Sequence, residues 1–307
     1  MPSSDETFHP DLVQAARRCP PMVVRRWSVP VLNLLGSLVC RFSSAGDPVD
    51  LGDVSVFMHW PVQPRETPGP AILWLHGGGL LVGDARQDAS LIRRFVDELG
   101  VPVCSVQYRL AGAHPFPAPL DDCRSALDWL AARPDVDPSM IAVLGISAGG
   151  GLAAGLAQLC RGSGGVEPCL QVLVYPMLDD RSSDAPHPDE ASYRLWDRRS
   201  NRLGWGQYLR GHDQSAPPPC AVPSRMASLE GLPPAWIGVG TCDLFHDEDL
   251  AYARRLEASG VPTELVVVEG GFHAFDTVDP EADVSRAFFR SQVGAIRSRF
   301  LALGWTG

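Results

Sequence analysis

Three side chains that together can perform nucleophilic catalysis each follow an apolar run of the sequence: Ser147, Asp243 and His273. A serine hydroxyl is a weak nucleophile and needs a base to take its proton, and that base needs an acid to orient it. Serine, acid and histidine occur here in an order along the chain that such triads use. We therefore expect Ser147 to act as nucleophile, His273 as general base and Asp243 as the acid that orients His273.

The segment around Ser147, residues 145–149, has the pattern Gly-Ile-Ser-Ala-Gly. It follows the apolar run 141–144 and leads into residues 150–157, which are mostly small and helix-compatible. Glycines on both sides permit the strained turn and the close packing of a nucleophile between strand and helix. The free N–H groups at the start of the helix would face the negative charge that forms in the reaction.

The acid and the base have competing interpretations. His273 is the one histidine just past a predicted strand and after both other candidates, although a surface-loop histidine is the ordinary alternative. Asp247, Glu248 and Asp249 are rivals of Asp243. These three begin a predicted helix, where a solvated carboxylate interacts favourably with the helix dipole, so we keep Asp243 as the orienting acid.

A glycine loop, residues 76–79 with the sequence His-Gly-Gly-Gly, follows the buried apolar run 71–75. Without Cβ atoms, its N–H groups can turn toward a ligand, as they do in oxyanion holes of lipases and esterases. A flexible turn or a phosphate-binding loop is the alternative, but no Lys-Ser or Lys-Thr pair follows, which excludes a P-loop. We expect the N–H groups of Gly78, Gly79 and Ala148 to hold the oxyanion.

Composition excludes several other classes of function. The chain has 307 residues and a formal net charge of −10, without the basic stripe of a nucleic-acid-binding protein. Its 8 cysteines form no C-x-x-C pair and indicate reduced thiols of a cytoplasmic protein. No signal peptide is recognisable, and the apolar stretch 29–40 is too short to span a membrane. Residues 246–249 match no metal-ligand spacing, so we predict no metal and no cofactor.

Predicted strands alternate with predicted helices over most of the chain. Apolar runs indicate strands near 54–57 and at 71–75, 101–108, 141–144, 170–175, 235–240 and 264–268. Helical periodicity is found at 86–99, 118–132, 150–157, 247–258 and 281–303. This alternation predicts an α/β fold, in which helices cover both faces of a mainly parallel central sheet and the site lies at the carboxyl ends of strands.

Two segments depart from the alternation. Residues 1–45 are amphipathic and helical with proline breaks, and residues 181–225 carry many charges but no long apolar run. We therefore divide the chain into an N-terminal segment (1–45), the first part of the α/β core (46–180), an insertion over the sheet (181–225) and the second part of the core (226–307).

In six motifs taken in order, the chain resembles the hormone-sensitive-lipase-like branch of the α/β-hydrolases, also called bacterial family IV esterases. The motifs are residues 76–79, 108–110 with 114–117, 145–150, 175–179, 243–248 and 273–275. The resemblance implies an α/β-hydrolase fold with a helical cap made by residues 1–45 and 181–225. It also implies a serine carboxylesterase that hydrolyses small-molecule esters with short to medium acyl chains, often as a homodimer through the sheet edge.

Three positions depart from the family pattern. Ile146 stands where Asp or Thr is usual, the Gly112-Ala113 pair replaces Pro-Glu, and Ala274 follows the histidine where glycine is frequent. None of these removes a catalytic group, so they bear on the pH optimum and on substrate preference.

Substrate recognition and the class of reaction leave alternatives open. We expect His76, Gly77, Trp205, Tyr208 and Leu209, together with Trp196, to line or cover the substrate pocket, whereas the four cap residues could equally form only the core of the cap. The arginine pairs 17–18 and 25–26 fit an anionic partner or a solvated helix face. The same triad could also hydrolyse amides, carbamates or lactones, and plant gibberellin receptors resemble this family but lack the catalytic histidine.

Overall fold

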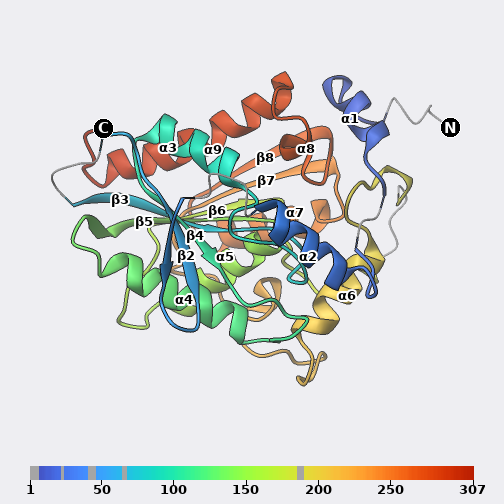
Figure 1. The fold of residues 1–307 in the computed structure, drawn as a ribbon, viewed down its shortest axis with the longest axis horizontal. Coiled ribbons are helices and arrows are strands. Elements are labelled where there is room, and N and C mark those ends of the chain that lie inside the picture. The colour runs from blue at the N-terminus through green and yellow to red at the C-terminus, as the bar shows by residue number, and fades with distance from the viewer. Residues whose placement is uncertain (1–6, 22–23, 41–45, 64–67, 185–189) are drawn as a thin grey trace.

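The computed structural model describes residues 7–21, 24–40, 46–63, 68–184 and 190–307, and within them one large sheet runs through the molecule (Figure 1). The strands of this sheet are β1 (Asp47–Asp50), β2 (Ser55–His59), β3 (Gly69–Leu75), β4 (Val103–Gln107), β5 (Val136–Ile146), β6 (Leu170–Val174), β7 (Ala235–Cys242) and β8 (Thr263–Phe272). Their order across the sheet is β1-β2-β4-β3-β5-β6-β7-β8. From β4 to β8 every neighbouring pair is parallel, while β2 is antiparallel to both of its neighbours, β1 and β4, which confirms the predicted mainly parallel sheet.

Helices connect the strands and cover the sheet. The α-helices are α1 (Val13–Arg18), α2 (Val29–Cys40), α3 (Ala89–Leu99), α4 (Ala118–Ala131), α5 (Ala148–Cys160), α6 (Arg198–Tyr208), α7 (His246–Ala258), α8 (Phe275–Val278) and α9 (Asp283–Ala302). The described residues also form the short 3₁₀ helices η1 (Pro10–Leu12), η2 (Glu190–Ser192) and η3 (Pro223–Arg225). The predicted helices at 86–99 and 281–303 are confirmed with slightly later starts, whereas β1 and α8 had no sequence signal.

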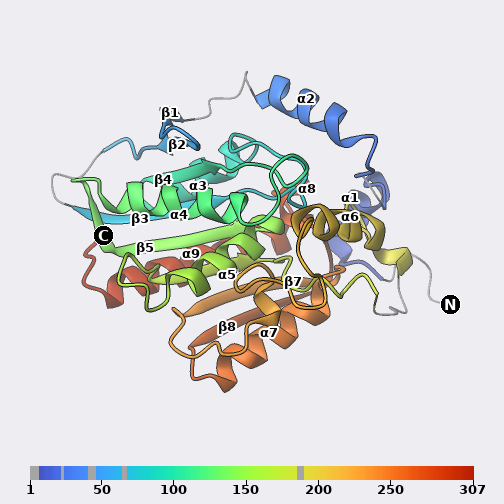
Figure 2. The same ribbon diagram turned by 90° about the horizontal axis from the view of Figure 1, so that it is seen from below.

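The apolar strands build a separate hydrophobic core on each face of the sheet (Figure 2). Leu73 and Leu75 of β3 belong to the core that α4, α5 and α7 cover. Ile72 and Trp74, which alternate with them, belong to the core that α3 and α9 cover. Because successive side chains of a strand point to opposite faces, a continuous apolar run is what a strand covered on both faces requires.

Two helices, α2 and α6, lie beyond the carboxyl ends of the parallel strands (Figure 2). Asp197 caps α6 by accepting a hydrogen bond from the Ser200 N–H at 2.8 Å. Asn33 of α2 donates to the carbonyl oxygen of Leu81 at 3.0 Å and so ties α2 to the loop after β3. The outward face of α2 and the turn before it expose large apolar side chains, namely Trp27, Val31, Leu34, Leu35 and Leu38.

The structure also bears on the composition-based predictions. None of the 8 cysteines forms a disulfide bond within the part of the chain that the structure describes. Among the described residues, no helix combines the length and the apolar character that crossing a bilayer requires. Parts of the predicted N-terminal segment and insertion, residues 1–6, 22–23, 41–45 and 185–189, lie outside the described residues.

Candidate active site

Ser147 lies at the sharp turn between β5 and α5, in a backbone conformation with φ 56° and ψ −119° that a serine rarely adopts. The neighbouring glycines make this turn possible. A Cβ atom on Gly145 would lie 2.1 Å from the carbonyl oxygen of Gly149, and one on Gly149 would lie 2.1 Å from that of Leu75. The turn therefore presses the start of α5 against β3 and β5, which fixes the position of the Ser147 side chain.

His273 connects the hydroxyl of Ser147 to the carboxylate of Asp243. Its Nε2 atom lies 3.0 Å from Ser147 Oγ, and its Nδ1 atom lies 2.8 Å from Asp243 Oδ2. Because a carboxylate only accepts, Nδ1 carries the proton in this arrangement, which leaves Nε2 free to accept the proton of the hydroxyl. All three side chains are buried, and each comes from the carboxyl end of a different parallel strand.

The surroundings hold the imidazole and its acid in place. Asp243 accepts a second hydrogen bond from the N–H of Phe245 at 3.0 Å, which orients the carboxylate toward His273. The rings of Tyr175 and Phe245 contact the imidazole edge-on, with centroid distances of 4.9 and 5.3 Å. The Tyr175 hydroxyl donates to the buried Asp276 at 2.9 Å, so the tyrosine ring that packs against His273 is itself fixed.

The glycine loop after β3 presents free N–H groups beside the turn of Ser147. Gly78 and Gly79 have φ values of +122° and +60°, a region that favours glycine. In the part of the chain that the structure describes, neither N–H finds a hydrogen-bond acceptor. Ala148 is the first residue of α5, so its N–H has no acceptor within the helix. Gly77 lies against the same turn, since its Cβ would be 3.3 Å from the carbonyl oxygen of Ile146.

His76 is fully buried beneath the glycine loop. Its Nδ1 atom lies 2.8 Å from the carbonyl oxygen of Gly77, and its ring stacks on Tyr108 at a centroid distance of 4.1 Å. Burial lowers the pKa of His76 to about 4, so this imidazole is neutral at physiological pH. The Tyr108 hydroxyl donates to the carbonyl oxygen of His76 at 2.7 Å, so both rings support the start of the loop.

The cap side chains named from the sequence pack among themselves. Trp205, Tyr208 and Leu209 are buried, and Tyr208 contacts Phe116 both ring to ring and through the Phe116 N–H. Trp196 lies directly over Gly79, because a Cβ on that glycine would be 1.9 Å from the indole Cη2 atom. Of these aromatic residues, Trp196 is the one that covers the candidate oxyanion hole.

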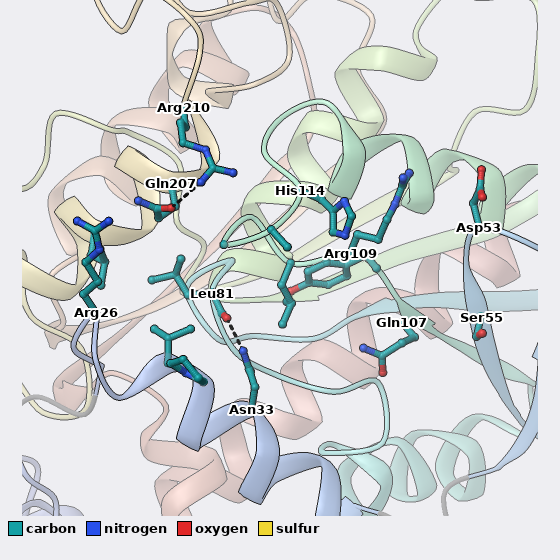
Figure 3. A pocket seen from close by; sticks show the side chains of 17 residues that line it. Arg26, Asn33, Asp53, Ser55, Leu81, Gln107, Arg109, His114, Gln207 and Arg210 are labelled. Atoms are coloured by element: carbon teal, nitrogen blue, oxygen red, sulfur yellow. Dashed lines mark hydrogen bonds between the residues drawn. The ribbon is translucent and has the colours of Figure 1, made fainter.

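A cavity of about 730 Å³ opens between α2, α6 and the loop after β4 (Figure 3). The sequence analysis missed three residues that line this cavity, Leu203 and Gln207 of α6 and Arg210 just after the helix. Their spacing of four and three residues places them on one helix face, opposite the aromatic face. That helical periodicity was the signal that could have identified them.

Two of the acids considered as rivals of Asp243 are not solvated. Glu248 and Asp249 are buried, so their interpretation as a solvent-exposed helix start is wrong, whereas Asp247 is exposed as predicted. Glu248 accepts hydrogen bonds from the N–H groups of Leu178 and Asp179, at 2.6 and 3.1 Å. Both oxygens of Asp249 lack a partner among the described residues. Burial raises the pKa of both carboxyl groups well above the usual range.

The unusual positions of the sequence lie close to the site. Ile146 packs into the core beneath α3 and α9, which suits an apolar side chain. Ala274 has a φ of 61°, which explains why glycine fits well at this position. Gly112 and Ala113 lie in the wall of the cavity. No group of metal-ligating side chains occurs within the described ranges.

The chain is similar to known proteins in sequence and in fold. A family model described as the alpha/beta hydrolase fold matches residues 72–277. The carboxylesterase NlhH of Mycobacterium tuberculosis is 37% identical over 221 residues, which cover 70% of this chain and 69% of the relative. The ethyl acetate hydrolase of Pseudomonas putida is 34% identical over 224 residues, 69% of each chain. Among solved structures, a bacterial heroin esterase matches with a TM-score of 0.85 and 32% identity, over 97% of this chain and 99% of that chain.

Proposed function

We propose that Ser147, His273 and Asp243 catalyse the ester hydrolysis of this protein. The chain belongs to the hormone-sensitive-lipase-like branch of the α/β-hydrolase family and hydrolyses carboxylic esters. The observation that carries the proposal is the position of His273, with one ring nitrogen 3.0 Å from the serine hydroxyl and the other 2.8 Å from the acid. Such a relay activates a hydroxyl that is otherwise a weak nucleophile.

In the first half of the reaction, Ser147 Oγ forms a bond to the ester carbonyl carbon while its proton moves to Nε2 of His273. Asp243 stabilises the imidazolium that results. The N–H groups of Gly78, Gly79 and Ala148 hold the oxyanion of the tetrahedral intermediate. When that intermediate collapses, the ester C–O bond breaks and the alcohol leaves with the proton from His273.

In the second half, water attacks the acyl-enzyme along the same route. His273 takes a proton from the water, the new tetrahedral intermediate collapses, and Ser147 regains its proton as the carboxylic acid leaves. The chain's own residues supply each proton transfer.

Replacing the nucleophile tests this route. Ser147→Ala should lower turnover of a p-nitrophenyl ester by on the order of 10⁶, while Ser90→Ala, an exposed serine on α3, should keep wild-type turnover. If the Ser147→Ala variant retained wild-type activity, another nucleophile would carry the reaction.

We infer a preference for short to medium acyl chains. The indole of Trp196 over Gly79 limits the space beside the candidate oxyanion hole. A relative with 34% identity is an ethyl acetate hydrolase, which acts on a short acyl group. A series of p-nitrophenyl esters of increasing acyl length should give its highest kcat/KM among the shorter members, and a maximum at the longest chains would oppose this preference.

Our proposal extends to the domain bounds, the cellular location and the oligomeric state of the protein. We propose that residues 1–45 and 181–225 form the cap over a core of residues 46–180 and 226–307. We also propose a cytoplasmic location, because no disulfide bond joins the cysteines among the described residues. From the resemblance we also propose a homodimer through a sheet edge, and sedimentation velocity on the full chain measures it.

A further inference from the structure

The cavity between α2, α6 and the loop after β4 carries positive charge that nearby acids do not neutralise. Arg26 and Arg210 line it, and neither forms an ion pair within the described ranges of the chain. Arg109 also lines it but is paired with Asp122 at 2.6 Å. In a chain with a net charge of −10, such a concentration of unpaired cations is a local departure from the overall charge.

These charges are not spread evenly around the cavity (Figure 3). Arg210 and Gln207 from the C-terminal end of α6 lie on the same side as Arg26, which precedes α2. Asp53, the acidic residue of the lining, lies on the opposite side. Among the described residues, the Arg210 guanidinium donates to the neutral Gln207 at 3.4 Å and forms no ion pair, so it is available to an anion. One side of the cavity is therefore cationic.

The rest of the wall is largely apolar. Its apolar side chains are Val29, Pro30, Leu81, Leu110, Ala113 and Leu203, and polar residues such as Asn33, Ser55 and Gln107 complete the lining. A volume of about 730 Å³ lies within the range of pockets that hold small organic ligands. A ligand that matches both parts must combine an alkyl chain with an anionic group.

We propose that this cavity binds an alkyl carboxylate, with the carboxylate between Arg26 and Arg210 and the chain against Leu81, Leu110 and Leu203. Guanidinium groups bind carboxylates through paired hydrogen bonds, which a lysine or a neutral side chain cannot reproduce. Ser147 and His273 are not among the lining residues, so the carboxylate held here is not the group that Ser147 attacks. The ligand is either a free fatty acid or an ester that carries a second, charged carboxylate.

Calorimetric titration of the Ser147→Ala variant with decanoate and with decanol tests the site without hydrolysis. Decanoate should bind about three- to tenfold more tightly than decanol at low salt, and this preference should shrink at high salt. The double variant Arg26→Gln/Arg210→Gln, made in the same background, should lose the preference. Arg254→Gln, an exposed arginine of α7 without an ion pair among the described residues, should keep it.

Equal affinity for decanoate and decanol, or a preference that the double variant retains, would overturn the proposal. Both arginines are exposed, so the variants should melt with the parent protein. If the double variant melts at a lower temperature than the parent protein, the single variants Arg26→Gln and Arg210→Gln test the site instead. Each should lose part of the preference for decanoate.

A kinetic comparison on the active protein distinguishes a free fatty acid from an ester substrate as the source of the carboxylate. This experiment, unlike the calorimetry, rests on the proposed function. The substrates are a p-nitrophenyl ester whose acyl chain ends in a carboxylate and the uncharged ester of equal length. A preference for the charged ester that the double variant loses assigns the site to the substrate. If the two esters react at equal rates and decanoate still binds, the site belongs to a free fatty acid. If neither the preference for the charged ester nor the preference for decanoate is found, the proposed site is contradicted.

Discussion

The indole ring of Trp196 packs onto the backbone of Gly79, so closely that a Cβ on this glycine would lie 1.9 Å from the ring. Gly204 of α6 reinforces the contact, because its own Cβ would lie 2.7 Å from the Gly79 carbonyl oxygen. Residues of the 181–225 segment thus set the position of the loop that we propose as the oxyanion hole. The absence of a side chain at Gly79 is what allows this close approach.

Gly79→Ala should therefore lower kcat/KM by on the order of 10² or more, because the new methyl displaces either the loop or the indole. Trimming the indole in the double variant Gly79→Ala/Trp196→Ala should restore part of that loss, since alanine tolerates the left-handed backbone at modest cost. Steady-state kinetics on a p-nitrophenyl ester measure both.

Gly78→Ala provides the matched comparison. Here the Cβ would lie 1.9 Å from the carbonyl oxygen of Val82, which is backbone. Trp196→Ala should give no recovery of kcat/KM in this variant. Equal recovery in both double variants would contradict the direct contact between Trp196 and Gly79.

Asp243→Asn should lower kcat by on the order of 10⁴, because the amide no longer holds His273 in the tautomer that accepts the serine proton. Asp247→Asn, the matched change at the exposed start of α7, should leave kcat near the wild-type value. Circular dichroism on both variants separates loss of catalysis from loss of fold. A similar fall in both would mean that the acid is misassigned.

Sequence reasoning located the candidate triad because each member lies at a strand end. A parallel sheet brings carboxyl ends to one edge, so the chain positions of Ser147, Asp243 and His273 already predicted their proximity. The glycine loop was readable for the same reason, as residues 76–79 directly follow a fully buried strand. Hydrophobic periodicity and glycine placement are local properties, and local properties can be read from a sequence.

Burial of polar groups was not readable in this way. Glu248 begins a helix as predicted, but it is buried because the N–H groups of Leu178 and Asp179, about seventy residues earlier, donate to it. In the same way, Trp205 and Tyr208 are buried, and Phe116, almost a hundred residues earlier, packs against Tyr208. Such long-range contacts decide which face of a helix is covered, and amino-acid type alone does not.

Asp249 should make the protein less stable as pH rises. Burial raises the pKa of its carboxyl group well above the usual range, so the folded protein keeps a proton that the unfolded chain releases above about pH 4. In that window the unfolded state binds fewer protons, and each pH unit lowers the free energy of unfolding by about 1.4 kcal/mol until the folded-state pKa is reached.

Asp249→Asn should remove this contribution. Urea unfolding between pH 5 and 8 should show that the difference in unfolding free energy between variant and wild type grows in favour of the variant as pH rises. Glu257→Gln, an exposed acid on the same helix, serves as control and should show a constant difference. A constant difference for Asp249→Asn as well would mean that this carboxylate is ionised in the folded protein.

Covalent labelling with diethyl p-nitrophenyl phosphate tests the central claim most directly, since this reagent phosphorylates activated serine hydroxyls. Peptide mass spectrometry should find one diethylphosphoryl group per chain, on Ser147, in step with the loss of esterase activity. The Asp243→Asn variant should react far more slowly, and Ser147→Ala should not be labelled. Inactivation with the phosphoryl group on another residue, or with Ser147 unmodified, would contradict the account.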